Sequence, residues 1–251
     1  MRARTSVDGF TLVELAVVLA IVGFLMASAM FVLSAQVDQR NFEESRRRLE
    51  QAREYLLAYA VVKGRLPCPA TAASNGAESI ATAAGSGTGG TCTLSYNGYL
   101  PAATIGFSPT NSDGLAMDGY GNPIRYAVSK TNEPQFTGNV SLKANWSTTP
   151  PADIDICLHL TAANQATCGA ASNRVVTNGT VVAVIWSQGK NFASTAGNAS
   201  FDESNNNDAF AAFVSRTPSP SGAANGEYDD ILVWIPVGLL YGRMIAAGVL
   251  P

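Results

Sequence analysis

The sequence has little of the chemistry that enzymes and metal sites most often use. Its 251 residues include one histidine and four cysteines, and only 14% are charged, against about 25% in a typical soluble domain. The histidine, His159, alternates with apolar neighbours, which predicts an exposed position on one face of a strand. No two cysteines have the C-x-x-C spacing of a structural zinc site. These shortages disfavour an enzyme and favour an exported structural or binding protein.

A long uncharged run stands near the N-terminus. Residues 15–33 carry no charge and are nearly all apolar. As a helix they would extend about 28 Å, close to the hydrocarbon thickness of a bilayer. Arg2 and Arg4 precede the run, and basic residues on the short leading side predict that this end stays in the cytoplasm. The rest of the chain is then expected to be exported.

Two kinds of export signal are compatible with this run. A Sec signal peptide would be cut after the small residues at 27–29, which have the A-x-A pattern, and the mature chain would begin at Met30. The hexapeptide G-F-T-L-V-E at residues 9–14 favours the other kind, because it places Glu14 at the edge of the apolar run. A carboxylate at the centre of a bilayer costs about 2.5–3.5 kcal/mol, and a simple secretion signal has no use for it.

This hexapeptide, followed by a long apolar helix, resembles the class III signal of type IV pilins and type II secretion pseudopilins. The resemblance implies cleavage between Gly9 and Phe10 by a prepilin peptidase, followed by N-methylation of Phe10. It also implies that the apolar helix stays on the mature protein. Asp8 departs from the pattern, since leaders of this family more often have a neutral or basic residue beside the cut.

Glu14 then gains a role in assembly. Cleavage creates a new amine on Phe10, and a neighbouring helix can place its own Glu14 opposite that cation. Breaking such a pair in a low-dielectric bundle costs several kcal/mol, and the pair would set the axial stagger of the two subunits. Many major pilins have a helix-kinking proline where this chain has Phe31, which favours a minor subunit.

The helix is predicted to continue past the apolar run to Val62, with Gly64 as its C-cap and Pro67 beyond its end. Arg46, Arg47 and Arg48 stand among glutamates, so we expect them to form a solvated helix face. A stripe at heptad spacing is expected to pack on a globular head; it consists of Phe42, Ser45, Leu49, Ala52, Leu56 and Tyr59.

The head is predicted to be built mainly from antiparallel strands. Residues 79–112 are uncharged and rich in glycine, serine, threonine and alanine, unlike a core sequence, so we expect a loop there, with a flexible glycine-rich stretch at 85–90. Asn178-Gly179 predicts a hairpin, and residues 236–248 predict a short amphipathic helix. Strands are expected at 124–128, 154–160, 175–177, 180–186 and 231–235. A long helix followed by such strands is an α+β, pilin-like layout.

The expected organisation has four parts. They are a cleaved leader (1–9), a transmembrane and filament-core helix (10–35), the amphipathic second half of that helix (36–63), and a globular head with loop-rich insertions (64–251).

The four cysteines are expected to form disulfides, because thiols in an exported domain are oxidised. Three pairings are possible from the sequence. We favour the sequential one, Cys68 with Cys92 and Cys157 with Cys168, because each pair closes a local, loop-rich segment. A bridge over such a loop stabilises a fold by about 3 kcal/mol.

Three further segments resemble pseudopilin heads. The D-G-Y-G-N-P turn at residues 118–123 is similar to their D-x-W-G-N-P turn, and Ser187-Gln188-Gly189 and Asp229-Asp230-Ile231 repeat their later pattern. Major pseudopilins hold calcium near the last segment. The resemblance therefore implies a calcium site at Asp229 and Asp230, with a carbonyl or carboxylate from residues 188–208. No other cofactor is expected.

These observations predict a minor pilin or pseudopilin of a type IV pilus or a type II secretion pilus. Its expected partners are other subunits, a prepilin peptidase and an inner-membrane assembly platform. We expect a single-pass protein of the bacterial inner membrane with an exported head, which then enters a pilus or periplasmic pseudopilus.

Two alternatives remain open. One is a pilus-tip binding module, an adhesin or a DNA-uptake subunit, and the other is a soluble protein secreted through Sec. The formal net charge of -3 disfavours nucleic acid as a partner, and loss of Arg2, Arg4 and Asp8 with the leader makes it one unit more negative.

Overall fold

The structure, a computed structural model, describes residues 11–85, 87–147, 152–195 and 199–251, without the side chains of residues 28–35. Gly9 and Phe10 lie outside the described residues. The chain forms two compact units, Met1–Arg40 and Asn41–Pro251.

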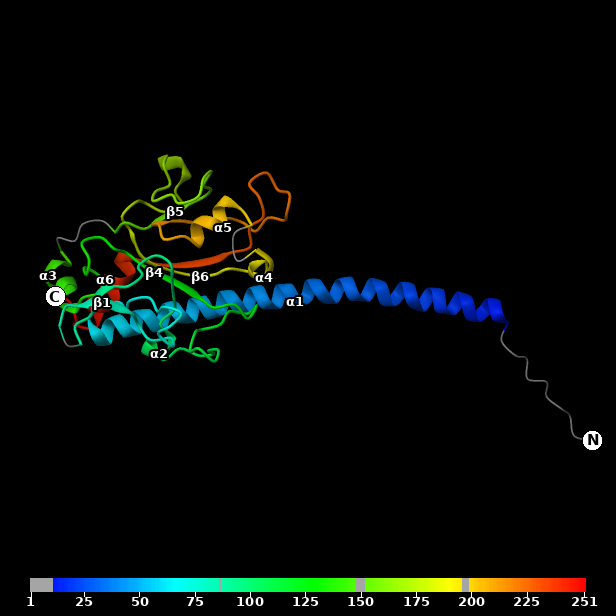
Figure 1. Ribbon diagram of the computed structural model, residues 1–251, viewed down its shortest axis with the longest axis horizontal. Coiled ribbons are helices and arrows are strands. Elements are labelled where there is room, and N and C mark those ends of the chain that lie inside the picture. Colours follow the sequence, from blue (N-terminus) through cyan, green and yellow to red (C-terminus); the bar gives the residue numbers. More distant parts are fainter. Residues whose placement is uncertain (1–10, 86, 148–151, 196–198) are drawn as a thin grey trace, which may run out of the picture. The chain divides into compact units, whose positions relative to one another are not determined.

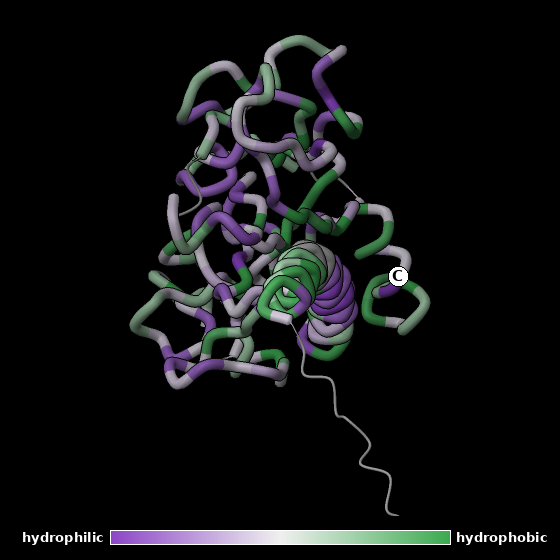
Figure 2. The backbone as a smooth tube through the Cα atoms, turned by 90° about the vertical axis from the view of Figure 1, so that its right-hand side faces the viewer, coloured by the Kyte–Doolittle hydropathy of each residue, from purple (hydrophilic) through white to green (hydrophobic). Residues whose placement is uncertain are grey.

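The first long element is helix α1, Leu12–Lys63. Its end agrees with the predicted one, because Gly64 adopts a left-handed φ of 72° and donates its N–H to the Ala60 carbonyl at 2.8 Å. Seen nearly end-on in Figure 2, α1 contains hydrophobic turns and also hydrophilic ones. The side chains of residues 11–27 are all exposed.

Among the helices in the described part of the chain, none is both long and apolar enough to cross a membrane. The transmembrane assignment of residues 10–35 therefore stays a prediction.

A four-stranded antiparallel sheet forms the centre of the second unit, in the order β3-β4-β6-β8. These strands are β3 (Gly98–Tyr99), β4 (Arg125–Val128), β6 (Val181–Ser187) and β8 (Ile231–Pro236). Two smaller sheets accompany it: the antiparallel pair β1 (Ile80–Ala83) and β2 (Gly90–Cys92), and the parallel pair β5 (Asp155–Cys157) and β7 (Ala212–Val214). The predicted α+β class, with a mostly antiparallel head, is confirmed.

The remaining helices are short. They are α2 (Ala102–Ile105), α3 (Asn139–Asn145), a 3-10 turn (Ala171–Asn173), α4 (Phe192–Thr195), α5 (Phe201–Asn206) and α6 (Val237–Ala246). The predicted amphipathic helix near the C-terminus corresponds to α6, which buries Leu240 and Met244.

The sheet separates two apolar clusters. On one face, Leu49 and Leu56 of α1 are fully buried in a cluster that includes Tyr126 and Ile185, and Figure 1 shows β4 and β6 beside the cyan part of α1. On the other face, Trp186 packs on Phe213 of β7, with ring centroids 5.1 Å apart. Each large apolar side chain contributes about 1.5–3 kcal/mol when fully buried, so the heptad stripe supplies the docking energy of the α1 segment in this unit.

The predicted strand at residues 175–177 and the predicted hairpin at Asn178-Gly179 are both wrong. Residues 175–177 form no strand, and the Asn178-Gly179 turn closes no hairpin, although it leads into β6. All seven residues of β6 are buried, and its partners are β4 and β8, which are distant in the sequence. Val175 instead donates its N–H to the Ile156 carbonyl at 2.8 Å. Local turn propensity was overridden by the pairing of a fully buried central strand.

Residues 79–112 are not one loop. The glycine-rich stretch at 85–90 connects β1 to β2, and Ala84 donates its N–H to the Gly89 carbonyl at 2.8 Å. The segment continues into β3 and α2, where Leu100 and Ala102 are fully buried. Low charge content here therefore did not indicate a single loop, since part of the segment is regular structure with buried residues.

The chain that leaves α1 is held by a buried ion pair. Arg65 donates to Glu78 at 2.7 and 2.8 Å, and Cys68 donates its N–H to the same carboxylate at 3.2 Å. Burial is the largest single influence and raises the pKa of Glu78. The hydrogen bonds and charge of Arg65, with the hydrogen bonds from Cys68 and Tyr59, together outweigh burial and hold the pKa below its usual value. The pair therefore stays charged and fixes the start of the first disulfide loop.

Candidate functional site

The N-terminal end of α1 contains Glu14, the predicted assembly residue. Thr11 donates both its N–H and its hydroxyl to Glu14 Oε2 at 2.9 Å, and Glu14 donates its N–H to Thr11 Oγ1 at 3.3 Å. This reciprocal pattern is a capping box, with Thr11 as N-cap. The T-x-x-E spacing of such a box is present in the sequence at residues 11–14, and it is the signal that marks Thr11. Glu14 thus has a hydrogen-bonded partner within its own chain.

The D-G-Y-G-N-P turn forms a polar junction in the second unit. Asp118 accepts hydrogen bonds from the N–H groups of Tyr120 at 2.9 Å and Asn122 at 2.7 Å, so its carboxylate closes the turn. The Ser187 hydroxyl donates to the other oxygen of Asp118. Burial raises the pKa of Asp118, and these hydrogen bonds oppose that rise. The Asn122 amide also donates to the Gly189 carbonyl at 2.6 Å, so two of the three family-like segments meet here.

The same turn is bonded to α1. Arg48 donates to the Met117 carbonyl at 2.9 Å and to the Asp118 carbonyl at 2.8 Å, while Ser45 accepts the Gly119 N–H at 2.9 Å. A Cβ at Gly119 would lie 2.3 Å from the Asn41 carbonyl oxygen, so only glycine permits this approach. The prediction of a solvated arginine face is wrong for Arg48, because its guanidinium is directed at backbone carbonyls of the turn.

Three carboxylates gather near the third family-like segment. Oxygen atoms of Glu203, Asp229 and Asp230 lie within 4.8 Å of one another. Glu203 belongs to α5 and falls within the stretch that we expected to supply a further ligand. Asp229 is held against the S-Q-G segment, because a Cβ at Gly189 would lie 2.1 Å from Asp229 Oδ1. The structure therefore brings together both predicted aspartates and one glutamate that the sequence did not single out.

Buried negative charge in this cluster is only partly compensated. Burial raises the pKa of Glu203 and Asp229, and it raises that of Asp230 well above its usual value. Asn191 donates its amide to Glu203 at 3.0 Å, and Asn206 donates to Asp230 Oδ2 at 2.8 Å.

The other oxygens, Asp229 Oδ1 and Asp230 Oδ1, are buried and accept no hydrogen bond from the described residues. Oxygen atoms of this kind fit a hard divalent cation such as Ca²⁺.

Both cysteine pairs are sequential disulfides. Cys68 is bonded to Cys92 and Cys157 to Cys168, and in each pair the Cα atoms are 5.3 Å apart. The first closes the β1–β2 segment onto the chain after α1. The second joins the end of β5 to the loop that follows it.

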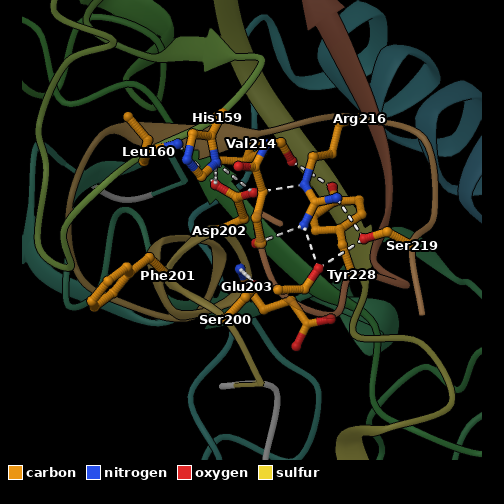
Figure 3. Close-up of polar contacts among 12 residues, drawn as sticks. His159, Leu160, Ser200, Phe201, Asp202, Glu203, Val214, Arg216, Ser219 and Tyr228 are labelled. Atoms are coloured by element: carbon orange, nitrogen blue, oxygen red, sulfur yellow. Dashed lines mark hydrogen bonds and ion pairs between the residues drawn. The ribbon is translucent and has the colours of Figure 1, made fainter. Parts of the chain in front are cut away.

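We predicted that His159 lies exposed on one face of a strand, and this prediction is wrong, because His159 lies after the end of β5. Its Nδ1 lies 2.9 Å from both carboxylate oxygens of Asp202, a fully buried residue of α5. Asp202 also accepts the Leu160 N–H at 2.8 Å and the Arg216 Nε–H at 2.6 Å (Figure 3). His159 precedes Asp202 by 43 residues and Arg216 follows it by 14. The sequence therefore contains no local pattern that predicts this contact.

Comparison with known proteins identifies the N-terminal segment. Residues 4–30 match the family described as the prokaryotic N-terminal methylation motif, which is the class III signal of type IV pilins and pseudopilins. The match includes Gly9, Phe10 and Glu14, and it confirms the resemblance found in the sequence. No curated protein and no solved structure matches the chain. The motif points to a structural subunit rather than an enzyme.

We predict that Arg48→Ala destabilises the second unit by about 2 kcal/mol, because it removes two charge-assisted hydrogen bonds to the turn. Arg47→Ala is the matched control, since the Arg47 side chain is 65% exposed and pairs with Glu44 on the surface; it should change stability by less than about 0.5 kcal/mol. Urea unfolding of the purified full-length protein in detergent measures both. Equal free energies of unfolding for the two variants would contradict the claim that Arg48 stabilises the unit by binding the turn.

Proposed function

We propose that this chain is a minor subunit of a type IV pilus or of a type II secretion pilus, processed after Gly9 and assembled through its N-terminal helix. The observation that carries the proposal is the methylation motif at residues 4–30. The motif supports a pilin- or pseudopilin-like prepilin, which implies processing by a prepilin peptidase and assembly with other subunits.

The proposed route begins with insertion of residues 10–35 into the bacterial inner membrane, with the head exported. Arg2 and Arg4 then remain on the cytoplasmic side, where the leader is removed. The exposed apolar side chains of α1 support this route, since they would be covered first by lipid and later by neighbouring subunits. An assembly platform in the inner membrane would move the subunit from one environment to the other.

Two partners are available to Glu14 along this route. Before assembly, the capping box satisfies its carboxylate within the chain. In the filament, the amine of Phe10 on a neighbouring subunit supplies an opposite charge in a medium of low dielectric, where a lone charge is costly. The capping box therefore lowers the cost of carrying Glu14 in a subunit that has not yet met its neighbour.

The minor role rests on two features of the chain. Phe31 stands where many major pilins have a helix-kinking proline. The second unit extends from Asn41 to Pro251, which is large for a subunit that must repeat at every position of a filament. A subunit present in few copies avoids that crowding.

We also propose that the Glu203, Asp229 and Asp230 cluster holds a calcium ion. Asp229 Oδ1 and Asp230 Oδ1, which are buried without hydrogen-bond donors among the described residues, would be ligands together with Glu203. The ion would neutralise charge that burial otherwise disfavours, and it would join α5 to the start of β8.

The mass of the N-terminal peptide, taken from protein recovered from its own cells, tests the processing step. We expect a peptide that begins with N-methylated Phe10, because the motif places the cut after Gly9. A mature chain that begins at Met30 would instead identify a Sec-secreted protein and remove the basis of the proposal.

Assembly is tested by two variants that separate the roles of Glu14. Glu14→Gln keeps a capping side chain but removes the charge, so its amount in sheared filaments should fall about tenfold or more relative to the membrane pool. Thr11→Ala removes the cap at a cost of about 1 kcal/mol but keeps the charge, and incorporation should be largely retained. Immunoblots of both fractions measure this. Normal incorporation of Glu14→Gln would refute the charge pair.

Calcium binding is tested by thermal unfolding of the full-length protein in detergent with calcium, magnesium or a chelator. Calcium should raise Tm by several degrees through preferential binding to the folded state, and magnesium should act more weakly. Asp230→Asn should raise Tm in the chelator, because it removes a buried charge, and should abolish the response to calcium. Asp113→Asn, at an exposed position, is the control and should keep the response. An unchanged wild-type Tm would refute the site.

A further inference from the structure

A hollow of about 570 Å³ opens on the second unit, and none of the residues assigned to assembly or to calcium lines it. Its size lies within the range of small-molecule binding pockets. Three separate segments form it: the loop after β5, the beginning of α5, and residues 224–226. Its polar lining consists of His159, Thr161, Ser200, Ser204 and Asn225.

The imidazole of His159 is held in one orientation. Both oxygens of Asp202 lie 2.9 Å from Nδ1, and a carboxylate that already receives N–H groups from Leu160 and Arg216 can only accept. When the ring is neutral, Nδ1 therefore carries the proton and Nε2 is an acceptor. The His159 side chain is 30% exposed and lines the hollow, so its imidazole is within reach of a ligand there.

The charged side chains next to the hollow, Arg216 and Asp202, already bind other groups of the protein. Arg216 donates to Asp202 at 2.6 Å, to the Ser219 hydroxyl at 2.6 Å, and to the carbonyls of Asn225 and Gly226 at 3.2 Å each, and it stacks over the Tyr228 ring (Figure 3). Asp202 itself is fully buried. The hollow thus offers no free cation for an anionic ligand and no free carboxylate for a cationic one among the described residues that line it.

The apolar part of the lining consists of one aromatic ring and small side chains. Phe201 lines the hollow and is 56% exposed, and Ala163, Ala199 and Ala224 add small apolar groups to the lining. The lining therefore combines hydroxyl, amide and imidazole groups with an aromatic ring and methyl groups, and among the described residues it contains no Asp, Glu, Lys or Arg. A sugar ring has the same combination, since its edge carries hydroxyls and one face carries C–H groups.

We propose that this hollow binds a neutral sugar residue, with a hydroxyl of the sugar donating to His159 Nε2 and its C–H face lying on the ring of Phe201. This binding function is separate from filament assembly and does not depend on it. It would give the subunit a recognition surface for glycans.

The test uses the single histidine as a reporter. Full-length protein labelled with isotopes only in histidine gives one set of imidazole signals, from His159. In a detergent without sugar groups, it is titrated with glucose, galactose, mannose, N-acetylglucosamine and N-acetylgalactosamine, and with inorganic phosphate and galacturonate as charged probes. We expect at least one neutral sugar to shift the signal with saturation and the charged probes to bind more weakly.

Matched variants locate the binding. Phe201→Ala should weaken the affinity for that sugar about tenfold or more, as loss of a central aromatic contact commonly does. Phe210→Ala should leave the affinity unchanged, because Phe210 is a similarly exposed phenylalanine that lines a different hollow. The absence of any sugar-dependent shift, equal affinities for the two variants, or preferential binding of a charged probe would each overturn the proposal. None of these outcomes depends on whether the protein enters a filament.

Discussion

The arrangement of the second unit depends on the carboxylate of Asp118 and the turn that it closes. Asp118 fixes the backbone of residues 118–122, and this backbone is what Arg48 and Ser45 of α1 bind. Ser187 binds the same carboxylate from the end of β6. A buried acid in this position is costly unless its oxygens are satisfied, and here each oxygen receives at least one hydrogen bond. The turn therefore joins helix and sheet through polar contacts that specify one geometry, while the heptad stripe supplies most of the energy.

The third family-like segment is placed by the same junction. Asn122 holds the Gly189 carbonyl, and Gly189 in turn leaves room for Asp229 because it has no Cβ. The S-Q-G and D-D-I segments thus meet although many residues separate them in the chain. Residues that the sequence marked as three isolated resemblances form one continuous set of contacts, from α1 through the end of β6 to the start of β8.

Periodicity and local residue chemistry were sufficient to predict several elements of this structure. The stripe of α1, the glycine at its C-cap and strands β4, β6 and β8 follow from patterns within a few residues. The errors came from contacts between residues that are distant in the sequence. The hairpin predicted at Asn178-Gly179 does not form, because β6 pairs with β4 and β8 instead. Arg48 is not part of a solvated face, because it donates hydrogen bonds to backbone carbonyls of the turn. Glu203 and Asp202 could not be assigned from sequence, because acidic residues in a polar, asparagine-rich stretch usually indicate solvent exposure.

Most of helix α5 is buried although its amino-acid composition predicts an exposed segment. Its buried residues include Asp202, Glu203, Asn205 and Asn206, a polar set for a short helix. Asp202 is directed to His159 and Arg216, whereas Glu203, the next residue, receives the amide of Asn191 and lies beside Asp229. Successive helical residues point in different directions, so one turn supplies a carboxylate to each of two sites. The hydrogen bonds that satisfy one carboxylate also hold the helix in place for the other. The hollow beside His159 and the acidic cluster therefore share one structural support, and each depends on the burial of the other's anchoring acid.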